Sequence, residues 1–298
     1  MLLSLCFASI VGLAQAVTPD SPQAAMTRLL EADRSFAAAA AGKTPVDAIS
    51  AMFADDVSVP AGPAFVQGKP KAIEALRANP DNLAGAVEWT PVGGGISADG
   101  VHGFTFGYMT ASKADGSNVP LKYLAYWVQG ANGWRVAVYR RRPRAAGEVS
   151  TAMMTPSLPA RLTAPSTDAA MVRQHGASLA AAEKAFSDLA QTVGLQAAFA
   201  KNGRDDAINM GGPNVAGFIV GAQAISQSVG EGAPTDRSEL EWSADRVLVA
   251  SSGDFGVTGD RPTHPEVPHV ARHAPRRRRA GRRRLRREVA PVGRPHSR

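Results

Sequence analysis

Cysteine and histidine are scarce in this sequence, and their scarcity excludes several kinds of site. Cys6 is the only cysteine of the 298 residues, and it lies in the apolar run Leu2–Ala16. Outside residues 261–298 there are only two histidines, His102 and His175, and neither has a ligand-like neighbour at helical or hairpin spacing. We therefore expect no disulfide, no thiol catalysis, no metal site and no cofactor.

Basic charge is also scarce, except at one end of the chain. The formal net charge is +7, yet residues 261–298 hold 13 Arg, no Lys and two acids, a local charge of +11. Subtracting 11 from 7 leaves −4 for residues 1–260. A mildly acidic body offers no general basic surface for nucleic acid, so we expect no specific nucleic-acid partner.

The apolar run Leu2–Ala16 is too short to span a bilayer. It ends in Ala14-Gln15-Ala16, a small-x-small pattern like a signal-peptidase site, although no Lys or Arg precedes it. The alternative is a buried N-terminal helix. We interpret residues 1–16 as a signal peptide, which predicts a periplasmic or secreted protein with no membrane attachment after cleavage.

Three strands in succession are predicted over Gly103–Arg142. Aromatic and β-branched residues alternate with other residues at a two-residue period, as in FTFGYM, LKYLAYW and WRVAVY. Asp115-Gly116 and Asn132-Gly133 tolerate positive φ and separate these strands as hairpin turns. A meander with one aromatic face needs a cover, and we expect it from the helices upstream.

Helices and a short strand precede the meander. Ser21-Pro22 and Thr44-Pro45 each place a capping residue before proline, which predicts two helix starts. A short strand at 57–60 and a third helix at 69–79 follow. We predict an α+β fold over residues 24–142, with a curved antiparallel sheet packed on three helices.

The same plan begins again after a Pro-, Ser-, Thr- and Ala-rich linker at 143–166. Five short stretches match in order, at nearly constant offsets; the last pairs Asp254-Phe255-Gly256 with Thr105-Phe106-Gly107. We interpret this as a tandem duplication whose second copy, 167–260, is incomplete. The segment 261–298 is Arg-, Pro- and His-rich, which predicts a disordered tail that arose from a frame change near Thr258–Asp260.

The ordered elements resemble those of the SnoaL-like proteins of the nuclear-transport-factor-2-like superfamily, which are related to ketosteroid isomerases. The resemblance depends on Asp55-Asp56 after the second helix, on Gly68 before the third, and on the LKYLAYW and NGWRV stretches. It implies a cone, formed by a curved mixed sheet on three helices, with an apolar pocket. Members include isomerases, cyclases, dehydratases and many non-catalytic proteins, so the resemblance does not select a reaction.

Candidate site residues come from the meander. We expect the walls of the pocket to include aromatic residues of two strands: Phe104, Phe106, Tyr108, Tyr123 and Trp127. His102 is the candidate acid or base at the mouth of the pocket, with a surface role at a strand end as the alternative. Core packing is the alternative for each aromatic residue. We interpret Arg140-Arg141-Arg142 as a solvated edge.

No Asp or Glu other than the turn residue Asp115 lies between Gly103 and Tyr139, so the meander offers no carboxylate base. We therefore expect an exported protein that binds a small apolar molecule without turnover. The alternative is an acid–base isomerase, cyclase or dehydratase acting on a small apolar substrate. The duplication suggests an intramolecular pseudo-dimer of the two copies, or else a homodimer.

Overall fold

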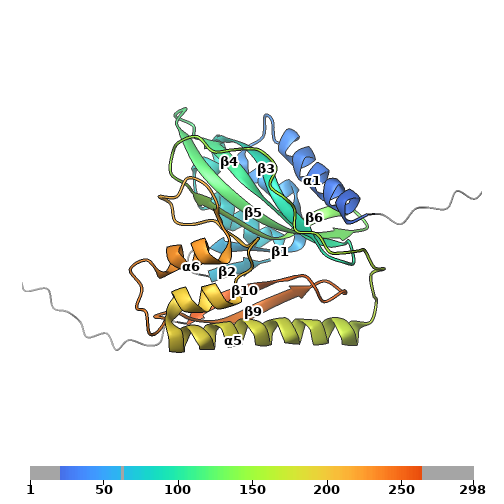
Figure 1. The fold of residues 1–298 in the computed structure, drawn as a ribbon. Helices are drawn as coiled ribbons and strands as arrows, with labels where there is room; N and C mark the ends of the chain where they lie inside the picture. The colour runs from blue at the N-terminus through green and yellow to red at the C-terminus, as the bar shows by residue number, and fades with distance from the viewer. Residues whose placement is uncertain (1–20, 62–63, 264–298) are drawn as a thin grey trace, which may run out of the picture. The chain divides into compact units, whose positions relative to one another are not determined.

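A six-stranded sheet forms the centre of the N-terminal half (Figure 1). The computed structural model describes residues 21–61 and 64–263, and all of these belong to one compact unit. The strand order is β2-β1-β6-β5-β4-β3. The strands are β1 (Phe53–Ala61), β2 (Ala64–Gln67), β3 (Ala86–Ile96), β4 (His102–Ser112), β5 (Asn118–Gly130) and β6 (Gly133–Pro143).

Strands β3 to β6 form an antiparallel meander, which confirms the hairpin prediction. Gly116 and Gly133 have φ values of 81° and 79° at the two predicted turns, in the left-handed region that glycine tolerates. The first strand, β1, runs parallel to β6 and antiparallel to β2. The sheet is therefore mixed, as the family resemblance implied, and the pairing of β1 with β6 is its departure from the antiparallel pattern predicted from the hairpins.

Four helices accompany this sheet: α1 (Pro22–Ala38), α2 (Pro45–Ala51), α3 (Lys69–Arg77) and the single turn α4 (Asp81–Ala84). Ser21 Oγ accepts a 3.1 Å hydrogen bond from the Ala24 N–H. Thr44 Oγ1 likewise accepts one of 3.2 Å from the Asp47 N–H. These side chains satisfy backbone donors that a helix start leaves free, and both predicted helix starts are confirmed.

The main hydrophobic core lies between these helices and one face of the sheet. We call this the inner face; it carries Tyr123 and Trp127, which are both buried. Two glycines of β4 make room for the core. A Cβ at Gly103 would lie 2.5 Å from Leu29 Cδ2, and one at Gly107 would lie 2.8 Å from Tyr123 Cε1. Larger residues at these positions would overlap with the core side chains.

The C-terminal half begins with a long interrupted helix. Its elements are α5 (Ala169–Asn202), β7 (Ile208–Asn209), β8 (Ile219–Val220), α6 (Ala222–Gly230), β9 (Glu241–Val249) and β10 (Gly256–Thr263). Gly194, with φ of 77°, divides α5 into two helical stretches. The β9–β10 hairpin lies between α5 and the sheet face opposite the inner face (Figure 1), where Leu248 and Val257 pack near Tyr126. We call that face the outer face.

The segment between β6 and α5 is held against the free edge of β3. The Met154 N–H donates to the Val92 carbonyl at 2.7 Å, and the Ser157 N–H donates to the Gly94 carbonyl at 3.0 Å. Ser157 also forms an isolated parallel bridge with Gly95. The predicted linker therefore covers part of an edge strand that would otherwise present unpaired backbone groups.

Two boundaries differ from the prediction. β1 begins at Phe53, so Asp55-Asp56 lies within a strand rather than at a helix end. β10 continues to Thr263 because backbone pairing with β9 needs no apolar side chains, so three residues of the predicted tail are in a strand. The arginine run Arg140-Arg141-Arg142 lies past Val138, where the pairing of β6 with β1 ends, and it is paired with β5.

Two predictions fall outside the described residues. They are the signal peptide at 1–16 and the rest of the tail, 264–298. Within the described part of the chain, no helix is both long enough and apolar enough to cross a membrane.

Candidate functional site

The five residues predicted to line one pocket lie on both faces of the sheet. In an antiparallel pair, residues directly opposite each other share a face. Tyr123 is opposite Gly107, whereas Phe104 is opposite Tyr126. Tyr123 and Trp127 therefore face the helices, and Phe104, Phe106 and Tyr108 face the outer side. The structure does not bring the five together, because the aromatic sets of β4 and β5 are one residue out of phase.

The outer aromatic residues are covered by the C-terminal half. The Phe104 ring stacks on Phe255, with centroids 5.8 Å apart. Phe106 and Tyr108 both contact Phe218, at centroid distances of 4.9 and 5.3 Å. These residues are therefore engaged in packing between the two halves of the chain.

His102 shares the outer face with Phe104, as expected, but it does not lie at the mouth of a pocket on the inner face. Its Nδ1 lies 2.9 Å from the Tyr126 hydroxyl. Burial lowers the pKa of His102, and the nearby Asp99 partly opposes that shift. A neutral imidazole that contacts Tyr126 at the interface of the two halves fits a structural role.

A buried polar cluster on the inner face was missed by the sequence prediction. The Asp33 side chain, on α1, is 0% exposed. Its Oδ1 accepts a 2.7 Å hydrogen bond from Trp89 Nε1, and its Oδ2 accepts a 2.8 Å bond from the Tyr123 hydroxyl. Trp127 Nε1 donates to Thr105 Oγ1 at 2.8 Å in the same region. Buried polar groups that are paired in this way tie a helix to a sheet.

The electrostatics of this cluster follow from its burial. Desolvation raises the pKa of the Asp33 carboxyl, and hydrogen bonds from Thr105, Trp89 and Tyr123 partly offset that effect. Burial, together with the Asp33 charge, raises the pKa of the Tyr123 phenol well above its usual range. Tyr123 is therefore a hydrogen-bond donor at neutral pH rather than a base.

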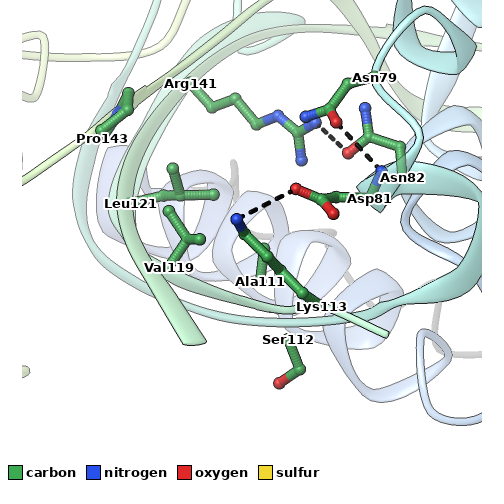
Figure 2. Close-up of a pocket in the computed structure, with 10 residues that line it drawn as sticks. All are labelled: Asn79, Asp81, Asn82, Ala111, Ser112, Lys113, Val119, Leu121, Arg141 and Pro143. Atoms are coloured by element: carbon green, nitrogen blue, oxygen red, sulfur yellow. Dashed lines mark hydrogen bonds and ion pairs between the residues drawn. The ribbon is translucent and has the colours of Figure 1, made fainter. Parts of the chain in front are cut away.

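A pocket opens at one end of the inner face, where β4 and β6 end and β5 begins (Figure 2). Its volume is about 330 Å³. We call it the Arg141 pocket; its lining residues are Asn79, Asp81, Asn82, Ala111, Ser112, Lys113, Val119, Leu121, Arg141 and Pro143. Apolar side chains from the strands form one wall, and amide and charged groups form the other. Leu121 connects it to the buried cluster, because Tyr123 is the next residue of β5 on the same face.

Arg141 is the main polar group of this pocket (Figure 2). Its Nη2 donates a 2.6 Å hydrogen bond to Asn82 Oδ1, and Asn82 Nδ2 donates to the Leu76 carbonyl at 2.5 Å. Arg141 Nη1 is buried and has no hydrogen-bond partner among the described residues. Lys113 pairs with Asp81 at 3.5 Å. The pocket therefore holds one positive charge in excess and one unused guanidinium donor.

A bulge explains why sequence reasoning placed Arg141 elsewhere. Strict alternation from Trp134 along β6 would point Arg141 to the outer face. The register of β6 against β5 shifts between the pairs Tyr126–Val138 and Trp127–Val136. This shift turns the rest of β6 over, so Tyr139 joins the inner core and Arg141 follows on the same face.

Another pocket of about 420 Å³ lies beside β1 and the β5–β6 turn, and His102 and Lys69 contribute to its lining. Its other charged side chains are Asp55, Asp56 and Arg135, so both signs of charge line it and no single ligand charge is favoured. Over residues 21–61 and 64–263 no group of three His, Cys, Asp or Glu side chains is placed to hold a metal ion. The expectations of no metal and no cofactor stay predictions.

Comparison with known proteins identifies similar folds only. No protein-family model and no curated protein matches the chain. One similar solved structure is a protein of unknown function with a cystatin-like fold from Nostoc punctiforme, with 13% identity over 40% of this chain and 90% of that one, and a TM-score of 0.32. A second is an NTF2-like protein of unknown function from Shewanella oneidensis, with 11% identity over 40% and 98% of the two chains, and a TM-score of 0.30.

A third is a ketosteroid isomerase-like protein from Erwinia carotovora atroseptica, with 19% identity over 42% and 94% of the two chains, and a TM-score of 0.28. Identities and TM-scores this low transfer no activity to this chain. The fold class predicted from the sequence, an α+β curved sheet on helices, is confirmed. The second and third of these structures are described as NTF2-like and ketosteroid isomerase-like, the superfamily that the sequence resemblance named.

Proposed function

We propose that this protein binds a small molecule with an apolar body and an anionic group in the Arg141 pocket, without chemical turnover. The single observation that carries the proposal is the buried Nη1 of Arg141, which has no partner among the described residues. Leaving a buried charged donor unpaired is costly, so a ligand oxygen at this position would be favourable. A carboxylate oxygen would accept a charge-assisted hydrogen bond from this nitrogen.

The surroundings of Arg141 support the same ligand chemistry. Val119 and Leu121 offer apolar area to the body of the ligand. Asp81 would repel an anion, but its charge is offset by Lys113. Asn82 holds the other end of the guanidinium, so Arg141 loses little conformational freedom on binding.

Titration calorimetry with a panel of aromatic and aliphatic monocarboxylates tests this proposal. The Arg141→Met variant should bind a carboxylate about 10- to 100-fold more weakly, the range expected for loss of a charged hydrogen bond. Arg140→Met is the matched control, because Arg140 is exposed and opposite Leu124 on the outer face. Equal affinities of the two variants, or no binding by the unaltered chain, would contradict the proposal.

An acid–base enzyme is the second candidate, and the Asp33–Tyr123 hydrogen bond is the observation in its favour. A carboxyl group of raised pKa beside a phenol donor is a pair that such chemistry uses. Against it, both carboxylate oxygens are occupied within the core and the side chain is 0% exposed. Turnover of enolisable ketones that disappears in Asp33→Asn but persists in Arg140→Met would favour the enzyme.

Export is the second part of the proposal, and it rests on the sequence alone. The apolar run ending in Ala14-Gln15-Ala16 supports cleavage after Ala16 and a periplasmic or secreted location. Mass spectrometry of the cell-envelope fraction should then find a chain that begins at Val17. An intact Met1 in the cytosolic fraction would contradict it.

A further inference from the structure

The two halves of the chain share a specific backbone conformation before a helix. Gly68 precedes α3 with φ of 97°, and Gly221 precedes α6 with φ of 89°. Each of these glycines donates its N–H at 2.8 Å to a carbonyl of the preceding segment, that of Val57 or of Ala207. Positive φ at this point requires glycine in each half. We call the separation of these two glycines along the chain the repeat spacing.

The turn of the following hairpin is also the same in both halves. Gly100 in the β3–β4 turn has φ of 70°, and Gly253 in the β9–β10 turn has φ of 75°. Each donates its N–H to the carbonyl three residues earlier, that of Ser97 at 3.0 Å or of Ala250 at 2.9 Å. These glycines too are separated by the repeat spacing.

Even an irregularity in the strand pairing recurs. In the first hairpin the register shifts directly before Gly93, which is opposite Phe106. In the second it shifts directly before Arg246, which is opposite Gly259. The two pairs are again one repeat spacing apart. A bulge is a specific feature that chance would rarely place twice in one register. Gly256 therefore corresponds to Gly103 rather than to Gly107, which corrects the last sequence match.

Finally, each half joins a helix to this hairpin through an acid and an indole. Trp89 Nε1 donates to Asp33, and Trp242 Nε1 donates to Glu183, both at 2.7 Å. The two tryptophans are also related by the repeat spacing. The two acids, Asp33 and Glu183, are slightly closer along the chain than the repeat spacing.

These equivalent turns meet each other. The Ala98 N–H donates to the Asp254 carboxylate at 3.0 Å, and the Ser251 N–H donates to the Asp99 carboxylate at 2.7 Å. Ala98 and Ser251 are themselves equivalent at the repeat spacing. The Asp99 N–H in turn donates to Oγ of its own equivalent, Ser252, at 3.2 Å. The donors of the first two bonds are therefore equivalent, and Asp99 contacts its own equivalent, as residues beside a two-fold axis do.

We infer that the C-terminal half is a second copy of the N-terminal fold and acts as its built-in partner, related to it by a pseudo-two-fold axis near Asp99 and Ser252. It occupies the outer face, where Phe255 and Phe218 cover Phe104 and Phe106. A separate subunit is then not needed to bury this face. The chain is a monomer in solution, and its outer face is closed to homodimer formation.

A cysteine pair at the axis tests this inference in the full chain carrying Cys6→Ser. The variant Asp99→Cys/Ser252→Cys should form a disulfide within one chain on oxidation, since Ser252 Oγ, whose place the new sulfur would take, lies 3.2 Å from the Asp99 backbone nitrogen. Asp115→Cys/Ser252→Cys is the control and should form none, because Asp115 lies beyond the opposite end of β4. Circular dichroism of the reduced variants checks that they fold. Disulfides between chains, or none at the axis, would overturn the inference.

A second measurement needs no change at the interface. A protease site inserted after Glu148, in an exposed part of the linker, allows the halves to be separated covalently. Light scattering should give the mass of one chain before cleavage and an undivided one-to-one complex of the fragments afterwards. Fragments that separate at micromolar concentration, or an uncut chain that is a dimer, would overturn the inference.

Discussion

Trp89 Nε1 donates a 2.7 Å hydrogen bond to Asp33 Oδ1, and this bond joins β3 to α1 through the core of the N-terminal half. Asp33 is fully buried and Trp89 is nearly so. The corresponding bond in the C-terminal half, between Trp242 and Glu183, has the same length but half-buried partners. We therefore expect this hydrogen bond to contribute more to the free energy of unfolding in the N-terminal half than in the C-terminal half.

Replacing each tryptophan by phenylalanine compares the contributions of the two hydrogen bonds to stability. Trp89→Phe leaves a buried carboxylate oxygen without its donor, which should lower the free energy of unfolding by about 2–4 kcal/mol. Trp242→Phe should cost about 1 kcal/mol or less, because water reaches Glu183. Urea denaturation followed by circular dichroism measures both. If both variants lost the same free energy of unfolding, burial would not determine the contribution of this hydrogen bond.

The raised pKa of Asp33 predicts how stability depends on pH. An unfolded aspartate titrates near pH 3.9, as ordinary aspartates do, whereas the folded protein keeps this proton to a higher pH. Between those two pKa values the folded state binds more protons, so this residue makes stability fall as pH rises. Asp33→Asn removes the titration.

The stability of the unaltered protein relative to Asp33→Asn should therefore be greatest at low pH and should decline as pH rises through that window. Urea denaturation at intervals from pH 3.5 to 7 measures the difference. The exposed Asp188→Asn serves as the control for general charge effects. A relative stability that increases with pH would mean that the folded protein favours the carboxylate.

Sequence patterns predicted elements of the fold better than they predicted its faces. Capping residues and turn glycines act locally, so Ser21, Thr44, Gly116 and Gly133 all have the conformations expected of them. A period of two shows which residues of one strand share a face, but it does not show which face of the next strand they match. That match depends on the register, which places Gly107 opposite Tyr123.

The two polar residues of the inner face were missed for different physical reasons. Asp33 is spaced four residues from Leu29 and belongs to the buried face of α1, but its partners come from distant strands. Without those partners, a charged side chain is expected to face water. Arg141 is flanked by two other arginines, and only the bulge in β6 decides which one points inward. Neither partners nor bulges can be read from local periodicity.

The linker contact with β3 gives a prediction about aggregation. Met154→Pro removes the N–H that donates to the Val92 carbonyl and should uncover the edge of β3 near Gly94. Hydrogen exchange in residues 92–96 should become faster, and light scattering on warming should begin earlier. Ser150→Pro, at an exposed position of the linker, is the control. Unchanged exchange would mean that the linker does not protect this edge.

Lys122 connects β5 to the segment before β8 and predicts a second pH effect. Its side chain is fully buried, and Nζ donates to the Val215 and Gly217 carbonyls at 2.7 and 2.8 Å. Burial, with Arg142 and Arg144 nearby, lowers the pKa of Lys122 to about 8. A neutral amine still has two N–H groups for these carbonyls, so the contact survives deprotonation.

Lys122→Met keeps the aliphatic stem but removes both donors, which should lower the free energy of unfolding by about 1–3 kcal/mol at pH 7. Between pH 8 and about 10.4, the usual lysine pKa, the unfolded state binds the proton that the folded state has released. Lys122 therefore makes the free energy of unfolding rise with pH in this range. The free energy of unfolding of the unaltered protein, relative to that of Lys122→Met, should therefore increase over that window. Urea denaturation at pH 7, 8, 9 and 10 measures this difference. A constant difference across these pH values would show that Lys122 titrates normally and that its burial carries no electrostatic cost.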